Sequence, residues 1–262
     1  MADEIKTYEI KKKDLKGAVV IDGFPSVGLV SSVVANYIVN ALHLEQIGTM
    51  ESGSFPTVSL IRDTEPQTPV RIYAGSMDEK NPNEKVAVFV SEFQPPPSMT
   101  SAIASAMLQW AVEQKCGLII SPEGLVIERE GEVTEKDMRD SESVKVYGVA
   151  SNERARAIIE VPDIHPFHEG VITGIAAVLL NEGKRRDFSV ISLLAEAHPN
   201  YPDARAAASI IDIVSRIILN THIDLRPLYE EAARIESQIK SIQKQTTMSK
   251  PQKHVPVPGM YG

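Results

Sequence analysis

The chain has 262 residues, of which 43% are hydrophobic and 24% charged, as is usual for a globular protein. Its 27 basic and 35 acidic side chains give a formal charge of -8, which argues against nucleic-acid binding because phosphate recognition needs a basic surface. The one cysteine, Cys116, excludes an internal disulfide and a cysteine-based zinc cage, and its apolar neighbours predict a buried packing role.

Apolar runs and helical stripes alternate along the chain and predict an α/β fold. A first strand at 18–21 leads into a turn and then a helix to about Leu42, with Ser26 as its N-cap. Because most strands are apolar throughout, we expect a three-layer α/β/α sandwich with a mixed, largely parallel sheet. The other strands are expected at 45–51, 57–61, 70–76, 86–91, 118–120, 144–149 and 188–196. The other helices are expected from Ser98 or Thr100 to Lys115, at 170–182 and at 202–220.

The chain after residue 224 differs from this α/β core, which we assign to residues 1–224. Residues 225–245 form a predicted amphipathic helix with apolar residues at three- and four-residue steps. That seam either packs on its own domain or contacts another subunit, and in the second case the oligomer contacts are Leu228, Ile235, Ile239 and Ile242. Residues 246–262 lack apolar periodicity and carry three prolines, which predicts a flexible, extended tail.

The tail ends in Met260, Tyr261 and Gly262. A tyrosine ring offers a large apolar face at low entropic cost, and its hydroxyl can form a hydrogen bond inside a pocket. The terminal carboxylate can be neutralised by a lysine. We interpret the triplet as a docking plug on a tether, although about one chain in a hundred would end this way by chance.

The turn at residues 23–28 lies between a strand and a helix, where phosphate-binding loops occur. Leu29 and Val30 stand where a P-loop requires Lys and Ser or Thr, and the glycine spacing of a dinucleotide fold is absent. We therefore interpret this segment mainly as a tight turn. An anion or another ligand at the helix start is the alternative role of Gly23, Phe24, Ser26 and Gly28.

The sequence assigns no residue to catalysis, to a metal or to a cofactor. His165 and His168 are separated by a proline and lack the spacing of a metalloprotease helix, so we place them in a helix N-terminal turn. The basic cluster 184–186 is expected at a helix C-terminus. The charge-rich segment 128–142 is expected to be an exposed hairpin or loop. A polar N-terminus and the absence of a long apolar stretch predict a cytoplasmic protein that does not enter a membrane.

Several segments can be compared together with known families: 23–30, 170–179, 192–197, 201–207 and 222–225. They resemble the archaeal branch of the proteasome assembly chaperone family, over roughly residues 15–235. The resemblance implies an α/β fold similar to nucleoside phosphorylases, without that activity. It also implies binding to the α-ring of the proteasome core particle. Met260 would be the hydrophobic contact, Tyr261 would fill the pocket, and the Gly262 carboxylate would pair with a lysine of the ring.

The sequence therefore predicts a non-enzymatic chaperone or activator-like protein that self-assembles and docks its C-terminal residues on the α-ring. It would assist assembly of that ring or cap it and favour gate opening. One alternative is a nucleotide- or phosphate-binding enzyme, similar to ATP-grasp ligases or nucleoside phosphorylases, with its site near the turn at 23–28. A passive oligomeric scaffold is a further alternative.

Overall fold

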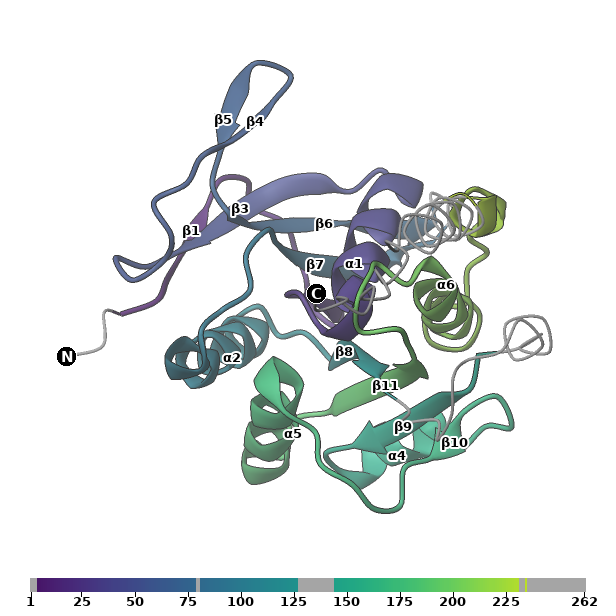
Figure 1. Ribbon diagram of the computed structural model, residues 1–262. Coiled ribbons are helices and arrows are strands. Elements are labelled where there is room, and N and C mark those ends of the chain that lie inside the picture. Colours follow the sequence, from purple (N-terminus) through teal and green to yellow (C-terminus); the bar gives the residue numbers. More distant parts are fainter. Residues whose placement is uncertain (1–3, 79–80, 127–143, 231–233, 235–262) are drawn as a thin grey trace, which may run out of the picture.

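The computed structural model describes residues 4–78, 81–126, 144–230 and 234, and these form one mixed sheet with helices on both faces (Figure 1). The strand order of the main sheet is β1-β3-β6-β7-β2-β8-β11-β9-β10. Its strands are β1 (Lys6–Glu9), β2 (Val19–Gly23), β3 (Glu45–Glu51), β6 (Val70–Asp78), β7 (Asn81–Ser91), β8 (Leu118–Leu125), β9 (Val146–Ala150), β10 (His165–Pro166) and β11 (Val190–Glu196).

The mixed sheet that the sequence predicts is confirmed, with its parallel part at the centre. The strands β7, β2, β8 and β11 run parallel to their neighbours in this series. The series β1-β3-β6-β7 is antiparallel, and so is the pair β9–β11. The connection from β6 to β7 is too short for a crossover helix, which is why that flank folds back antiparallel.

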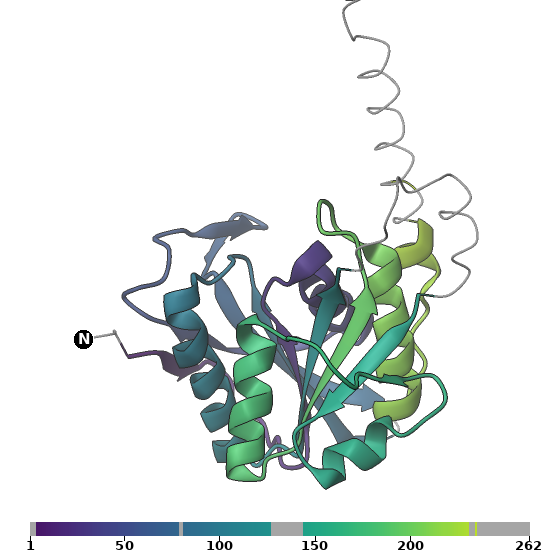
Figure 2. The ribbon, with the colours of Figure 1, turned by 60° about the horizontal axis from the view of Figure 1, so that its bottom comes forward.

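Helices cover the two faces of the sheet and complete the expected three-layer sandwich (Figure 1, Figure 2). One face carries α1 (Val30–Ala41), α4 (Glu153–Ile159) and α6 (Ala204–Ile213), and the other carries α2 (Pro97–Glu113) and α5 (Gly174–Arg186). Side chains along a strand alternate between these two cores. In β2, Val20 faces α2 and α5 whereas Ile21 faces α1 and α6.

Several element boundaries differ from the sequence-based expectation. α1 begins at Val30, because the preceding residues form the short 3-10 turn η1 (Val27–Leu29). Ser26 does not cap that turn with its side chain; its Oγ accepts a hydrogen bond from the Ser31 N–H at 3.2 Å. α5 begins at Gly174 rather than at 170, and α6 passes into the π-helical segment η2 (Val214–Ile218).

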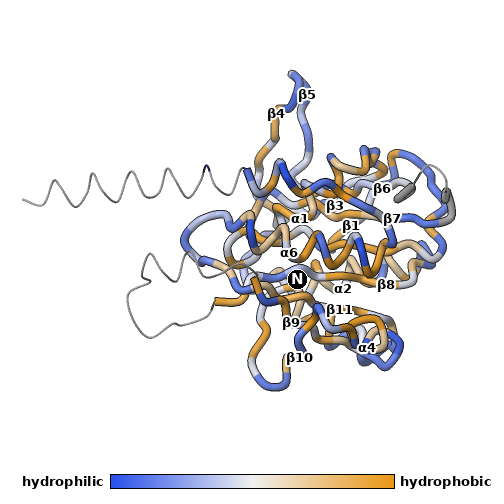
Figure 3. Tube along the Cα trace, turned by 90° about the vertical axis from the view of Figure 1, so that its right-hand side faces the viewer, coloured by the Kyte–Doolittle hydropathy of each residue, from blue (hydrophilic) through white to orange (hydrophobic). Residues whose placement is uncertain are grey.

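The strand predicted at 57–61 is part of a separate hairpin arm. β4 (Leu60–Arg62) pairs with β5 (Glu65–Gln67) as a two-stranded sheet of its own. Figures 1 and 3 show this arm standing away from the main sheet. A strand is thus present over the last two residues of the predicted range, but it lies outside the main sheet, because a short apolar segment does not reveal which strand it pairs with.

The C-terminal predictions lie largely outside the described residues. Residues 226–230 are helical, which agrees with the start of the expected helix, and the tail 246–262 and the segment 128–142 are not described. Among the helices that are described, none is long and apolar enough to cross a bilayer.

A buried cation, Arg71, ties the antiparallel flank to the base of the arm. Its side chain is fully buried, and its Nη2 lies 2.5 Å from Glu92 Oε1. Its Nη1 donates to the Thr68 carbonyl at 2.9 Å and its Nε donates to Tyr73 Oη at 3.0 Å. The same carboxylate oxygen of Glu92 accepts a hydrogen bond from Arg62 of β4 at 2.7 Å. Glu92 thus joins an interior guanidinium to one at the surface.

Replacing Arg71 by methionine should lower the free energy of unfolding by about 2 kcal/mol, since Glu92 and the Thr68 carbonyl lose a charged donor in a buried setting. Arg62→Met is the matched control, because it removes the half-exposed partner of the same carboxylate and should cost under about 1 kcal/mol. Urea denaturation of both variants measures the difference. An equal loss of unfolding free energy in the two variants would contradict the inference that the buried ion pair contributes more than the exposed one.

Candidate functional site

A pocket opens at the carboxyl ends of β2 and β8, in the centre of the sheet. From β2 the chain passes through α1 to β3 on one side, and from β8 it continues to β9 on the other side. Neighbouring strands whose connections leave in opposite directions form a crevice where ligands of open α/β sheets commonly bind. The fold thus provides a binding position before any side chain is considered.

The pocket has a volume of about 280 Å³, close to the lower end for small-molecule sites. Its walls come from the turn after β2, the connection between β7 and α2, the end of β8, and the first turns of α2 and α5. Its lining residues are Asp22, Phe24, Pro25, Ser26, Val27, Gln94, Pro95, Thr100, Glu123, Thr173, Gly174 and Ile175.

Asp22, the penultimate residue of β2, is 1% exposed. Its Oδ1 accepts a hydrogen bond from the Phe24 N–H at 3.0 Å, and its Oδ2 accepts one from Ser121 Oγ at 2.8 Å. Burial raises the pKa of this carboxyl to about 6, because desolvation of the charge outweighs the two hydrogen bonds. Asp22 is therefore poised to change its protonation near neutral pH.

Glu123 is the second carboxyl of the pocket and lies on β8, two residues after Ser121. Burial raises its pKa well above the usual range, and the negative charge of Asp22 raises it further. Within the described part of the chain, no donor forms a hydrogen bond with the Glu123 carboxyl. Two neighbouring carboxyls in a desolvated pocket disfavour the doubly ionised state, so this pair holds protons more tightly than surface acids do.

The turn at residues 23–28 forms one wall of this pocket and is tightly packed. Gly28 has φ 60°, and a Cβ added there would lie 2.7 Å from the His198 carbonyl oxygen, so glycine is required on both grounds. The Phe24 N–H is bonded to Asp22, and the Leu29 N–H donates to the Ser26 carbonyl at 2.9 Å. These contacts use amides that an anion would need. Anion binding by Gly23, Phe24, Ser26 and Gly28 remains a prediction, and the two carboxyls oppose it while they are ionised.

Comparison with known proteins assigns the chain to a family. The PAC2 family model matches residues 20–243. The chain belongs to the PAC2 family. An uncharacterized protein of Methanocaldococcus jannaschii is 26% identical over 263 residues, covering 98% of this chain and 99% of the relative. The family assignment made from sequence motifs is confirmed at this level.

Solved structures share the fold of this PAC2 protein. PbaA of Pyrococcus furiosus, described as an archaeal homolog of proteasome-assembly chaperone, is 25% identical with a TM-score of 0.74, covering 94% of this chain and all of the other. PbaB of the same organism, described as an archaeal proteasome activator, is 24% identical with a TM-score of 0.74, covering 92% of this chain and 99% of the other. These likenesses confirm the expected α/β architecture.

Of the residues of this PAC2 protein that were predicted to bind a partner or another subunit, the structure describes one, Leu228. Leu228 is 5% exposed and belongs to the core of its own chain, in agreement with the alternative that the start of the C-terminal helix packs on its own domain. The residues that lie outside the described part are Ile235, Ile239, Ile242, Met260, Tyr261 and Gly262.

The remaining polar candidates have structural roles. His165 lies on the edge strand β10 with its ring 5.7 Å from that of Tyr147, so the predicted helix N-terminal turn was wrong there. The described residues contain no group of three or more His, Cys, Asp or Glu side chains that could hold a metal ion. Burial raises the pKa of the Cys116 thiol to about 12, as suits a packing residue. Residues 184–186 form the last turn of α5, as expected.

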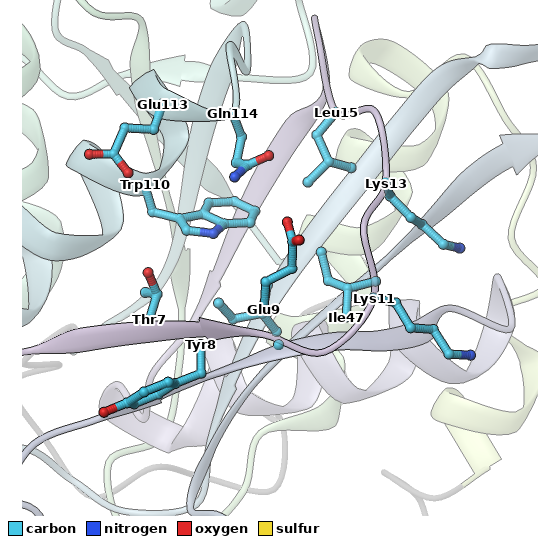
Figure 4. Close-up of a pocket in the computed structure, with 12 residues that line it drawn as sticks. Thr7, Tyr8, Glu9, Lys11, Lys13, Leu15, Ile47, Trp110, Glu113 and Gln114 are labelled. Carbon is cyan, nitrogen blue, oxygen red and sulfur yellow. The ribbon is translucent and has the colours of Figure 1, made fainter.

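A smaller pocket of about 170 Å³ lies between β1 and the C-terminal end of α2 (Figure 4). Trp110 of α2 and Gln114, which follows its last residue, face the strand residues Thr7 and Glu9 across it. Lys11 and Lys13 at its rim point away from Trp110 (Figure 4), and both form ion pairs with Glu45. The described lining residues of this pocket therefore offer no free cation, and it is the weaker candidate.

Sequence reasoning did not single out Asp22 and Glu123 as a pair. Each follows an apolar run that forms a central strand, so each acid stands at a strand's carboxyl end. An acid near the carboxyl end of a predicted central strand is the sequence signal that could have indicated this site. It becomes specific only when β2 and β8 are known to be neighbours, and strand order is not readable from one sequence.

The Asp22→Asn variant tests the raised pKa. Between about pH 4 and pH 6 the folded protein binds more protons at Asp22 than the unfolded chain does, so Asp22 lowers the free energy of unfolding as pH rises through this window. Relative to wild type, the variant should gain about 2 kcal/mol on going from pH 4 to pH 7. Urea denaturation at each pH gives the difference curve. Asp63→Asn, which removes an exposed carboxyl on the turn between β4 and β5, is the matched control.

Proposed function

We propose that this protein binds the α-ring of the proteasome core particle, as an assembly chaperone or as an activator. The observation that carries the proposal is its membership of the PAC2 family together with its two structural relatives, one described as a proteasome-assembly chaperone homolog and one as a proteasome activator. The relatives differ in their described roles, so both remain open for this chain.

The contact is assigned to Met260, Tyr261 and Gly262. Met260 supplies apolar area, Tyr261 fills a pocket of the α-ring with its ring, and the Gly262 carboxylate pairs with a lysine. Residues 246–262 reach at most about 60 Å when fully extended, which lets the triplet search for a pocket while the folded core stays outside the ring. Prolines in this segment reduce the entropy that the tether loses on docking.

Self-association supports this mode of binding, because one triplet offers little buried area. Several tails on one oligomer raise the effective concentration of the second and later contacts, so the assembly binds more tightly than one tail does. We assign the subunit contacts to Ile235, Ile239 and Ile242. Leu228 is left out because it is buried in its own core.

Tyr261→Ala should abolish binding of the intact protein to an archaeal proteasome core particle, since truncation of a buried aromatic anchor commonly costs 2 kcal/mol or more at each site. Surface-plasmon measurements with immobilised core particle give the affinity. Tyr8→Ala removes a half-exposed tyrosine on β1 and serves as the control, with unchanged binding expected. Unchanged binding by the Tyr261 variant would move the contact to the folded core.

Ile239→Asp should reduce the number of subunits per particle, because a buried carboxylate in an apolar seam carries a desolvation cost. Light scattering after size-exclusion chromatography measures the mass. Val112→Asp, at an exposed apolar position of α2, is the matched control and should leave the mass unchanged. A variant that keeps the wild-type mass would show that this seam packs on its own domain.

A further inference from the structure

A row of polar side chains crosses the central strands beneath the N-terminal ends of α2 and α5. Ser192 of β11 is in register with Ser121 of β8, and Ser121 Oγ donates to Asp22 of β2. Residues paired in parallel strands point to the same face of the sheet, so all three face the same helix layer. Ser192 is fully buried, and its Oγ has no hydrogen-bond partner among the residues that the structure describes. An unsatisfied buried hydroxyl in the same row as Asp22 leaves a donor and an acceptor for a ligand or an ordered water.

Glu123 extends this row along β8. It lies two residues beyond Ser121 and therefore on the same face of the sheet. Unlike Asp22, its carboxyl has no hydrogen-bond donor in the described part of the chain. The site thus contains two carboxyls, of which Asp22 accepts two hydrogen bonds and Glu123 accepts none from the described residues.

The ionisable side chains that line the pocket are all acidic. Among its lining residues, Asp22 and Glu123 are the ones that ionise, and the other polar members are neutral. The lining segments of α2, α5 and the β7–α2 connection present Thr100, Thr173 and Gln94. Among the described residues that line this pocket there is no lysine, arginine or histidine, so these residues supply no countercharge to the carboxyls.

We propose that this pocket binds a small primary amine, with its ammonium group between the carboxylates of Asp22 and Glu123 and its alkyl part against Phe24, Pro95 and Ile175. An ammonium group has three donors and forms short charge-assisted hydrogen bonds with carboxylates. Phe24 and Ile175 are buried apolar side chains and supply the wall that an alkyl chain needs. The volume of about 280 Å³ is sufficient for a small ligand of this kind.

Other ligand classes fit the pocket less well. A phosphate would meet two carboxyls and no cation among the lining residues, which makes its transfer from water unfavourable. A divalent metal needs more oxygen or nitrogen ligands than the pair supplies, and no cluster of three such residues is found in the described chain. The proposal is independent of proteasome binding, because it uses none of the residues assigned to docking.

Amine binding should be coupled to proton release. Without a ligand, burial keeps both carboxyls protonated to higher pH than usual, and a bound cation favours their ionised forms. The affinity should therefore rise with pH from about 5 to about 8. An adventitious contact between an amine and the acidic surface would not release protons in this range, since surface carboxyls are already ionised.

Isothermal titration of the intact protein with n-butylamine tests the proposal, with 1-butanol and butyrate as neutral and anionic ligands of the same size. We expect one saturable site for butylamine alone, with proton release detected from buffers of different ionisation enthalpy. Glu123→Gln should weaken binding at least tenfold, since a charge-assisted bond becomes a neutral one. Glu160→Gln, which removes an exposed carboxyl after α4, should bind as wild type does.

Equal affinity of butylamine for wild type and Glu123→Gln would overturn the proposal. Saturable binding of inorganic phosphate or butyrate in place of butylamine would overturn it as well, and so would the absence of saturable butylamine binding at about pH 8. The comparison of the three ligands on the wild-type protein decides the question even where the variant fails to fold. Loss of proteasome binding in the Tyr261 variant would have no bearing on this result.

Discussion

β2 and β8 lie side by side between two helix layers, and their side chains up to Ile21 and Ile120 enter one apolar core or the other. With both faces covered, polar groups can be placed only where these strands end. The hydrogen bond from Ser121 Oγ to Asp22 links the two strands at that edge, and both partners are buried. The turn at Gly28, the pocket and the first turns of α2 and α5 are all positioned relative to this pair of strand ends.

The two proposed functions use different parts of the chain. The docking proposed for Met260, Tyr261 and Gly262 depends on a short apolar and charged motif at the end of a tether, and it requires of the folded core only that it carry several tails together. The pocket between Asp22 and Glu123 depends instead on desolvation, which a rigid core supplies and a tether cannot. A ligand in the pocket and a partner at the tail can therefore act on the same molecule without competing for residues.

The fold was largely predictable from the sequence because apolar runs and helical stripes identify buried strands and amphipathic helices. The layers, the central strands, the buried Cys116 and the basic last turn of α5 follow from such local patterns. What could not be predicted depends on pairing. The arm formed by β4 and β5, the antiparallel flank and the proximity of Asp22 to Glu123 arise from strand order, which is set by contacts between distant segments. The predicted roles of Ile235, Ile239 and Tyr261 depend on partners and are properties of an assembly.

The carboxylate of Glu92 accepts from Arg71 inside the protein and from Arg62 on the arm. The inner pair holds β6 and β7 whether or not the outer pair forms, so a change in the length of the arm would be absorbed at its tip and would not reach the sheet. Arms of different length could thus be carried on an unchanged body. This segment is accordingly where we would expect related chains to diverge, and where a fluorescent or affinity label could be inserted without disturbing either the pocket or the C-terminal tail.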